Sequence, residues 1–130
     1  MMRRSSAKPA PERRQRAERA GRRAETLALW YLRLKGYRIE ARRYRTPIGE
    51  LDIVARRGRL IAVVEVKHRT RGGALGLADA LDAVNTRRIM AATEWFRAAH
   101  PRFQDCDFRF DVIAITPGRW PHHMVNAFWS

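Results

Sequence analysis

Residues 49–69, GELDIVARRGRLIAVVEVKHR, constrain the fold more than any other stretch of the chain. Apolar and β-branched residues dominate this stretch, and the pattern predicts two β-strands joined by a tight turn. Gly58 and Arg59 fit a two-residue turn, because glycine supplies the positive φ that a hairpin turn needs. Such a turn pairs Arg57 with Leu60 and thereby sets the register of the whole hairpin.

Charged side chains gather on one face of this predicted hairpin. Successive side chains of a strand alternate between the two faces of a sheet, so Glu50 and Asp52 share a face. Glu65 and Lys67 share a face for the same reason. Counting back from the turn, Asp52 lies opposite Glu65 and Glu50 lies opposite Lys67. The other face is wholly apolar and should be buried against helices; it consists of Leu51, Ile53, Ala55, Leu60, Ala62, Val64 and Val66.

Two carboxylates that face each other across a strand pair repel and need compensation. The Coulomb repulsion is about 4 kcal/mol at ~4 Å and an effective dielectric constant of ~20. A Mg²⁺ or Mn²⁺ ion removes it, since hard cations bind one or two carboxylates together with water and phosphate oxygens. The pattern therefore favours a metal-dependent nuclease, in which Lys67 orients water or stabilises charge on the phosphate. The alternative is a solvated polar face in which Glu50 and Lys67 form an ordinary surface ion pair.

The order and spacing of several motifs resemble the YraN family of small bacterial proteins. An acidic residue on one strand, followed by Glu-x-Lys on the next, also resembles the PD-(D/E)xK nuclease superfamily. The resemblance covers about residues 21–128. Its motifs are GxxxE at Gly21 and Glu25, AxxYL at 28–32, GY at 36–37, GELDIVA at 49–55, VEVKHR at 64–69, RFDVI at 109–113 and NAF at 126–128.

The resemblance implies a restriction-endonuclease-like α/β fold, with a mixed central sheet flanked by helices in the order α-β-β-β-α-β-β. It implies a metal site built from Asp52, Glu65 and the backbone carbonyl of Val66, with Lys67 as the catalytic lysine. In related Holliday-junction resolvases a glutamate on the first helix joins the site, which points to Glu25 as an auxiliary ligand. Many superfamily members bind nucleic acid without cutting it. A non-catalytic binding module in recombination, repair or DNA uptake therefore stays open beside an endonuclease that acts on DNA, branched or processed DNA included.

A large positive charge indicates a polyanionic partner. The 130 residues include 27 Lys or Arg against 13 Asp or Glu, a net charge of +14. This charge favours DNA or RNA as the partner and, less strongly, an anionic membrane; together with the nuclease resemblance it points to DNA. An RNA- or ribosome-associated protein is a third interpretation, which would explain the charge but not the carboxylates. Related resolvases work as dimers, and a homodimer would suit the cutting of both strands. The arginines expected to contact nucleic acid are Arg43, Arg45, Arg69, Arg71, Arg87 and Arg88.

The N-terminal segment holds half of the net charge. Residues 1–23 contain nine Lys or Arg and two Glu. Because residues 1–17 show no apolar periodicity, we expect a disordered basic arm there and a single domain over 18–130. The arm either tracks phosphates or is a dispensable tail. No apolar run approaches the ~20 residues of a membrane span, and no apolar region follows the N-terminal charges, so we expect a cytoplasmic protein.

The remaining pattern gives the expected order of elements. The lone Cys106 excludes an internal disulfide and a zinc knuckle. We interpret Asp111 as structural, and the adjacent His122 and His123 as unable to bind one ion together, because neighbours on a strand face opposite ways. The expected elements are a helix over 18–35 with Ala24, Leu27, Ala28, Tyr31 and Leu34 inward, a strand over 37–42, a loop over 43–48, the hairpin, a helix over 80–99, a strand over 108–115 and an edge strand over 122–128.

Overall fold

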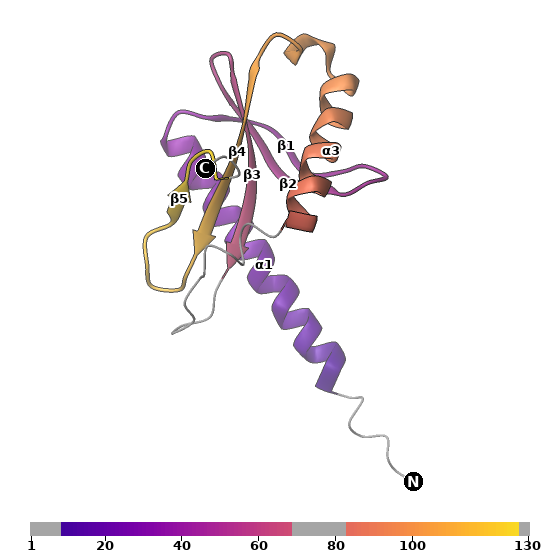
Figure 1. Cartoon of the computed structure of the whole chain (residues 1–130). Helices are drawn as coiled ribbons and strands as arrows, with labels where there is room; N and C mark the ends of the chain where they lie inside the picture. Colours follow the sequence, from indigo (N-terminus) through magenta and orange to yellow (C-terminus); the bar gives the residue numbers. More distant parts are fainter. Residues whose placement is uncertain (1–8, 69–82, 128–130) are drawn as a thin grey trace.

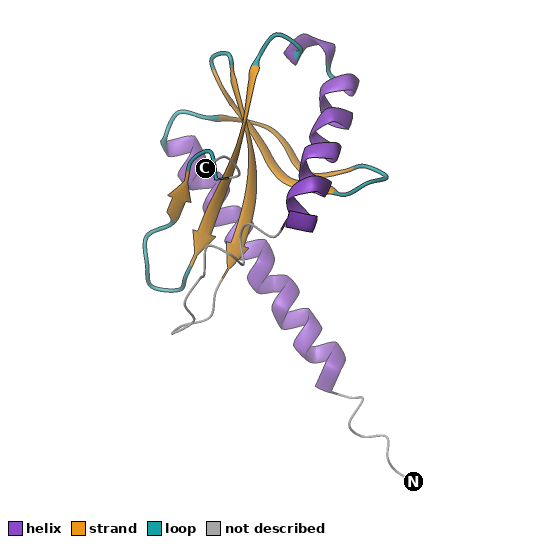
Figure 2. Ribbon diagram, in the orientation of Figure 1, coloured by secondary structure: helices purple, strands orange, loops and turns teal. Residues whose placement is uncertain are grey.

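A mixed five-stranded sheet with a helix on either face forms the framework of the protein (Figures 1 and 2). The computed structural model describes residues 9–68 and 83–127. The expected restriction-endonuclease-like arrangement, α-β-β-β-α-β-β, is confirmed. Its elements are α1 (Pro9–Leu34), β1 (Arg38–Arg45), β2 (Glu50–Arg57), β3 (Leu60–His68), α3 (Ala83–Ala99), the short 3₁₀ helix η2 (Pro101–Phe103), β4 (Asp107–Ile115) and β5 (His122–Met124).

The strands lie in the order β1-β2-β3-β4-β5. All neighbours are antiparallel except β3 and β4, which run parallel. A parallel pair needs a long crossover, and the chain between β3 and β4 provides it through α3 on one face of the sheet. Because β3 begins at the β2–β3 turn, its carboxyl end lies at the opposite end of the sheet from that turn, as Figure 1 shows.

The predicted register of the hairpin is confirmed. Arg57 pairs with Leu60, Ile53 pairs with Val64, and Gly58 has a φ of 63°. The pairs between β2 and β3 end at Ile53 and Val64. Glu50 pairs instead with Arg45 of β1, and the two side chains form an ion pair at 3.2 Å. The expected pairing of Glu50 with Lys67 is therefore wrong, because β2 leaves β3 before it reaches Glu50.

Two apolar clusters fill the two faces of the sheet. One lies under α1 and the other under α3. Leu51 belongs to the α3 cluster and not to the face that Ile53 occupies, so its expected place is wrong. Beyond the last β2–β3 pair, Leu51 is bound only to β1, so the alternation of the hairpin does not extend to it. The α1 cluster contains Ala24, Ala28, Leu29, Leu32, Tyr37, Ile53, Ala55, Ala62, Val64, Ile113 and Ile115.

Several expected boundaries need correction. α1 begins at Pro9, well before residue 18, so the expected disordered arm is in part helical. Proline suits the first helical position, and the Ala, Arg, Glu and Gln that follow favour helix without any burial. Residues 1–8 lie outside the described chain. Leu27 and Leu34 are 54% and 79% exposed, so they do not lie on the buried stripe of α1.

The other elements differ from expectation mainly at their ends. β1 runs to Arg45, so Arg43 and Arg45 lie in a strand and not in the expected loop. β5 ends at Met124, and Asn126 beyond it has a φ of 57°, which breaks the expected longer strand. The glycine-containing residues 69–76, which follow β3 in the sequence, lie outside the described residues. None of the helices in residues 9–68 and 83–127 is long and apolar enough to cross a membrane.

Candidate functional site

Asp52 lies where β2 separates from β3. The backbone N–H of Val66 donates a hydrogen bond to Oδ2 of Asp52 at 2.8 Å. This bond follows directly after the last backbone pair of the two strands, Ile53 with Val64. Burial raises the pKa of Asp52 to about 8, and the charge of Glu65 adds to the rise. A hydrogen bond between the two carboxyl groups raises the pKa of Asp52 further, so Asp52 retains its proton near neutral pH. The two acids therefore lie side by side, as the sequence predicted, although the β2–β3 pairing ends one residue before them.

Lys67 lies beside this pair. Its Nζ is 3.9 Å from Oε2 of Glu65, as expected for side chains two residues apart on one strand. The Lys67 and Glu65 side chains are 30% and 15% exposed, so the ammonium group lies nearer to solvent than the carboxylate. One cationic side chain therefore lies beside the two carboxyl groups, on their solvent-exposed side.

Glu25 of α1 faces the same region through Arg43. The Nε of Arg43 donates to Oε1 of Glu25 at 2.7 Å, and this bond raises the pKa of Arg43. Arg43 lies between the pairs Arg42–Ile53 and Tyr44–Leu51, which puts it opposite Asp52 on the neighbouring strand. Its φ of 48° is unusual for a residue other than glycine.

Arg43, Asp52 and Glu65 thus follow one line across β1, β2 and β3. The charge of Glu25 contributes to the raised pKa of Asp52, which places three acids within electrostatic reach of one another. Arg43 compensates one of these acids and so acts as an internal counter-ion. Sequence reasoning expected Arg43 to contact nucleic acid and missed its contact with Glu25, because the two lie on different elements.

The donor set is suited to a hard divalent cation. Asp52 and Glu65 supply carboxylate oxygens, and Mg²⁺ commonly binds one or two protein carboxylates and completes its shell with water. Among residues 9–68 and 83–127, no three Asp, Glu, His or Cys side chains converge closely enough to hold an ion by themselves. The fit therefore rests on two carboxylates with further oxygen from backbone, water or substrate. Glu25 accepts from Arg43 through Oε1, which leaves its Oε2 as the oxygen that would join them.

Of the other arginines expected to contact nucleic acid, Arg45, Arg87 and Arg88 lie among the described residues. Arg45 is 84% exposed and pairs with Glu50. Arg87 and Arg88 are exposed on α3. A β-carbon at Gly49 would lie 3.7 Å from Cβ of Arg88, so α3 brings Arg88 beside the β1–β2 turn. Arg69 and Arg71 lie outside the described residues.

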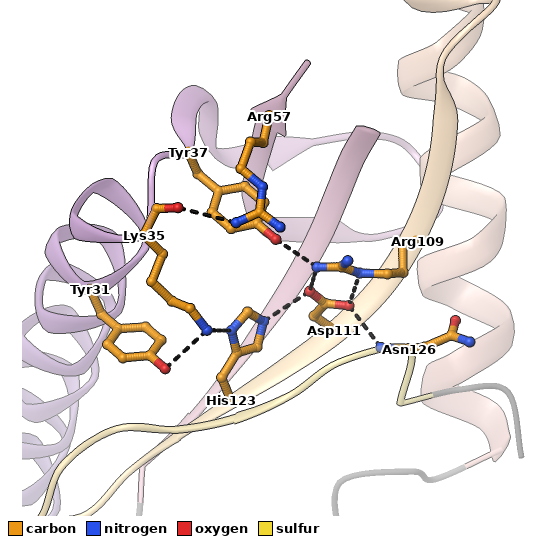
Figure 3. A network of polar contacts seen from close by, with 8 residues as sticks. All are labelled: Tyr31, Lys35, Tyr37, Arg57, Arg109, Asp111, His123 and Asn126. Atoms are coloured by element: carbon orange, nitrogen blue, oxygen red, sulfur yellow. Dashed lines mark hydrogen bonds and ion pairs between the residues drawn. The ribbon is translucent and has the colours of Figure 1, made fainter. Parts of the chain in front are cut away.

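A second polar cluster surrounds Asp111 on β4 (Figure 3). Asp111 is fully buried, and Arg109 donates to both of its oxygens, at 2.8 and 2.6 Å. The backbone N–H of Asn126 donates to Oδ1, and His123 contacts Oδ2 at 2.9 Å. Arg109 also donates to the hydroxyl of Tyr37 at 2.8 Å, which ties β4 to the chain just after α1.

The charges of this cluster balance internally. Burial alone would raise the pKa of Asp111, but hydrogen bonds from His123, Arg109 and Asn126 outweigh it and lower that pKa. An ionised carboxylate only accepts hydrogen bonds, so Nε2 of His123 is the donor. Nζ of Lys35 lies 3.5 Å from the other ring nitrogen of this histidine. These contacts agree with the structural interpretation of Asp111, and His123 joins it while His122 is exposed.

The comparisons with known proteins agree on one family. A model described as "Uncharacterised protein family UPF0102" matches residues 24–115. A UPF0102 protein of Parvibaculum lavamentivorans is 53% identical over 112 residues, which cover 86% of this chain and 83% of that protein. A UPF0102 protein of a Chelativorans species is 47% identical over 118 residues, covering 88% and 91%. One from Sphingopyxis alaskensis is 47% identical over 112 residues, covering 86% and 94%.

Proposed function

We propose that this chain, which belongs to the UPF0102 family, also called YraN, is a metal-dependent endonuclease that hydrolyses phosphodiester bonds of DNA. The observation that best supports the proposal is the contact between the carboxyl groups of Asp52 and Glu65, with the ammonium group of Lys67 3.9 Å from Glu65. A purely structural strand would gain nothing from two adjacent acids that repel each other whenever both are ionised. A nuclease needs such a pair to hold Mg²⁺ or Mn²⁺ against a phosphate.

Each residue then has a distinct task. Asp52 and Glu65 would hold the ion, with the carbonyl of Val66 as a further oxygen and Glu25 as an auxiliary ligand. When bound, the ion would polarise the phosphate and lower the pKa of a bound water. Lys67, whose Nζ is 3.9 Å from Glu65, is close enough to donate to that water or to the developing negative charge. Arg43 neutralises Glu25 while the site holds no ion.

The distribution of positive charge supports DNA as the substrate. The N-terminal part of α1 extends beyond the sheet, as Figure 1 shows. Arg16, Arg19, Arg22 and Arg23 on this part are exposed. Residues three, four and seven apart share one side of a helix, so Arg16, Arg19 and Arg23 form a continuous basic side. Such a row suits the phosphate backbone, where arginine and lysine provide affinity that is independent of sequence.

The test is cleavage of labelled single-stranded, duplex, flap and four-way-junction DNA with Mg²⁺, Mn²⁺ or EDTA. We expect cutting that requires the metal and that falls by at least about 10³-fold in Asp52→Ala and Glu65→Ala. Lys67→Ala should lose activity while it retains the bound ion. His68→Ala is the matched control, because His68 is the exposed neighbour of Lys67 and should cut like the wild type.

The outcome also separates the rival function. DNA binding in EDTA should persist in the Asp52→Ala and Glu65→Ala variants, because loss of an acid does not weaken contacts with phosphate. If the wild type binds these DNAs tightly but cuts none of them with either metal, the chain is a non-catalytic binding module. Sedimentation of the wild type with and without DNA would show whether it acts as a homodimer.

A further inference from the structure

A separate group of arginines converges at the other end of the sheet from Asp52 and Glu65. It surrounds the β2–β3 turn, which lies about 17 Å along β3 from Glu65 at ~3.3 Å per residue. A cavity of about 430 Å³ opens there between β1, β2 and the segment after α3. Its charged lining consists of Arg38, Arg56, Arg59, Arg102, Glu40 and Asp105.

A nearly buried carboxylate positions two of these arginines. Glu40, 10% exposed, accepts from Nε of Arg56 at 2.9 Å and from a terminal nitrogen of Arg102 at 3.4 Å. The pairing of β1 with β2 is irregular between Ile39 and Ala41, on either side of Glu40. Such a bulge changes the direction of a side chain. Here it lies at Glu40, whose carboxylate links β1 to Arg56 of β2 and to Arg102 of η2.

The remaining contacts fix the guanidinium groups further. Arg59 donates to the backbone oxygen of Asp105 at 2.9 Å, and Arg56 donates to that of Gly58 at 3.3 Å. Arg102 and Arg56 also lie over the ring of Phe103, at 4.5 and 5.8 Å. A guanidinium group has five N–H donors, so each of these arginines retains donors beyond the bonds named here.

We propose that this cavity binds a phosphate group. Four arginines and two acidic residues line it, which leaves an excess of positive charge around a space where Arg56, Arg59 and Arg102 are held in place. Arginine presents paired N–H groups whose geometry matches phosphate oxygens, and restrained arginines lose little entropy on binding. Arg56 and Arg102 are sufficient to neutralise and hydrogen-bond Glu40. The presence of Arg38 and Arg59 in the same lining is therefore not explained by Glu40.

The phosphate belongs either to a free small molecule or to the backbone of a nucleic acid. The binding itself needs neither the metal site nor cleavage. If the backbone is the source, the cavity deepens the proposed function by adding a DNA contact remote from the cutting site. All measurements below are made in EDTA on the full chain. Their results therefore do not depend on whether the protein cleaves DNA.

The first arm titrates pyrophosphate and inorganic phosphate into the wild type, into Arg59→Gln/Arg102→Gln, and into the charge-matched control Arg33→Gln/Arg42→Gln. All four arginines are exposed, so these variants should fold, which circular dichroism verifies. For a free ligand we expect the cavity variant to lose about tenfold in affinity and the control to stay within about twofold.

The second arm measures the affinity of the same three proteins for a labelled DNA duplex at several salt concentrations. For a backbone phosphate we expect the cavity variant to bind more weakly and its logarithmic salt slope to fall by about 1, while the control changes less. A loss confined to the cavity variant in either arm supports the proposal and identifies the source. If the cavity variant and the control behave alike in both arms, the proposal is wrong.

Discussion

The protonation of Asp52 is set by its surroundings in the fold. Burial and the charges of Glu65 and Glu25 raise its pKa from 3.8 to about 8. The folded state therefore binds this proton more tightly than the unfolded chain does. The free energy of unfolding in the absence of metal should fall as pH rises from about 4 to about 8, because only the unfolded chain then releases the proton freely.

Asp52→Asn should consequently stabilise the metal-free protein at alkaline pH. In EDTA near pH 8.5 we expect a gain of roughly 1–3 kcal/mol in the free energy of unfolding, shrinking towards zero near pH 4. The amide oxygen can still accept from Val66, so the strand junction stays intact. Urea unfolding at the two pH values measures the effect. A variant less stable than the wild type at pH 8.5 would show that the carboxylate is already compensated.

The contribution of Asp111 to stability should change with pH in the opposite direction from that of Asp52. Its pKa is lowered in the fold, so its contribution to stability is present above about pH 4 and is lost as pH falls further. Asp111→Asn leaves the Arg109 charge without its buried partner and should cost about 3–5 kcal/mol at neutral pH. Asp107→Asn, at the exposed start of the same strand, should change stability by less than about 0.5 kcal/mol. Equal unfolding midpoints for the two variants would contradict this account of the network.

Among the elements, the hairpin could be predicted from sequence and the first helix only in part. Gly58 and strict alternation fixed the register, because a shift by one residue would expose every core side chain of the strands. The residues of α1 before Ala24 have no apolar periodicity, and their helix rests on propensity alone. Leu27 and Leu34 fit a helical apolar stripe by spacing, yet the sheet covers a different side of α1.

The candidate site shows the same division. The juxtaposition of Asp52 and Glu65 follows from a local turn, so the sequence was sufficient. The Glu25–Arg43 bond joins a helix to a strand through a residue with positive φ, and no local pattern encodes it. The arginines of the cavity come from β1, β2, the turn and η2, which only the folded chain brings together. Arg109 and Asp111 share a strand face at a spacing of two, a signal that was available for their ion pair.

The basic side of α1 should provide affinity for DNA without affecting the fold. Arg16→Gln/Arg19→Gln/Arg23→Gln should reduce the logarithmic salt slope of duplex binding by about 3 and weaken binding at low salt. Glu12→Gln/Glu18→Gln, which removes two exposed negative charges from the same helix, should strengthen binding. Fluorescence anisotropy in EDTA compares the variants. If the arginine variant binds like the wild type, this helix does not contact DNA.

At the scale of the whole molecule, three groups of charged side chains among the described residues bear on the proposed functions. A two-carboxylate site with a lysine lies where β2 separates from β3, a basic side runs along the projecting helix, and a cavity with four arginines lies at the far end of the sheet. The proposed cation ligands belong to the first of these groups. If DNA contacts the basic side of α1, its phosphates would meet arginines there, whereas hydrolysis would need the carboxylates of the first site.

The central claim is that Asp52 and Glu65 hold a divalent cation, and a calorimetric titration of Mn²⁺ into the metal-free protein near pH 8.5 tests it most directly. At this pH Asp52 has largely released its proton, so competition between proton and metal is small. We predict saturable binding of about one ion by the wild type and a loss of at least about tenfold in affinity in Asp52→Asn and in Glu65→Gln. Binding that is absent in the wild type, or unchanged in both variants, would contradict the account.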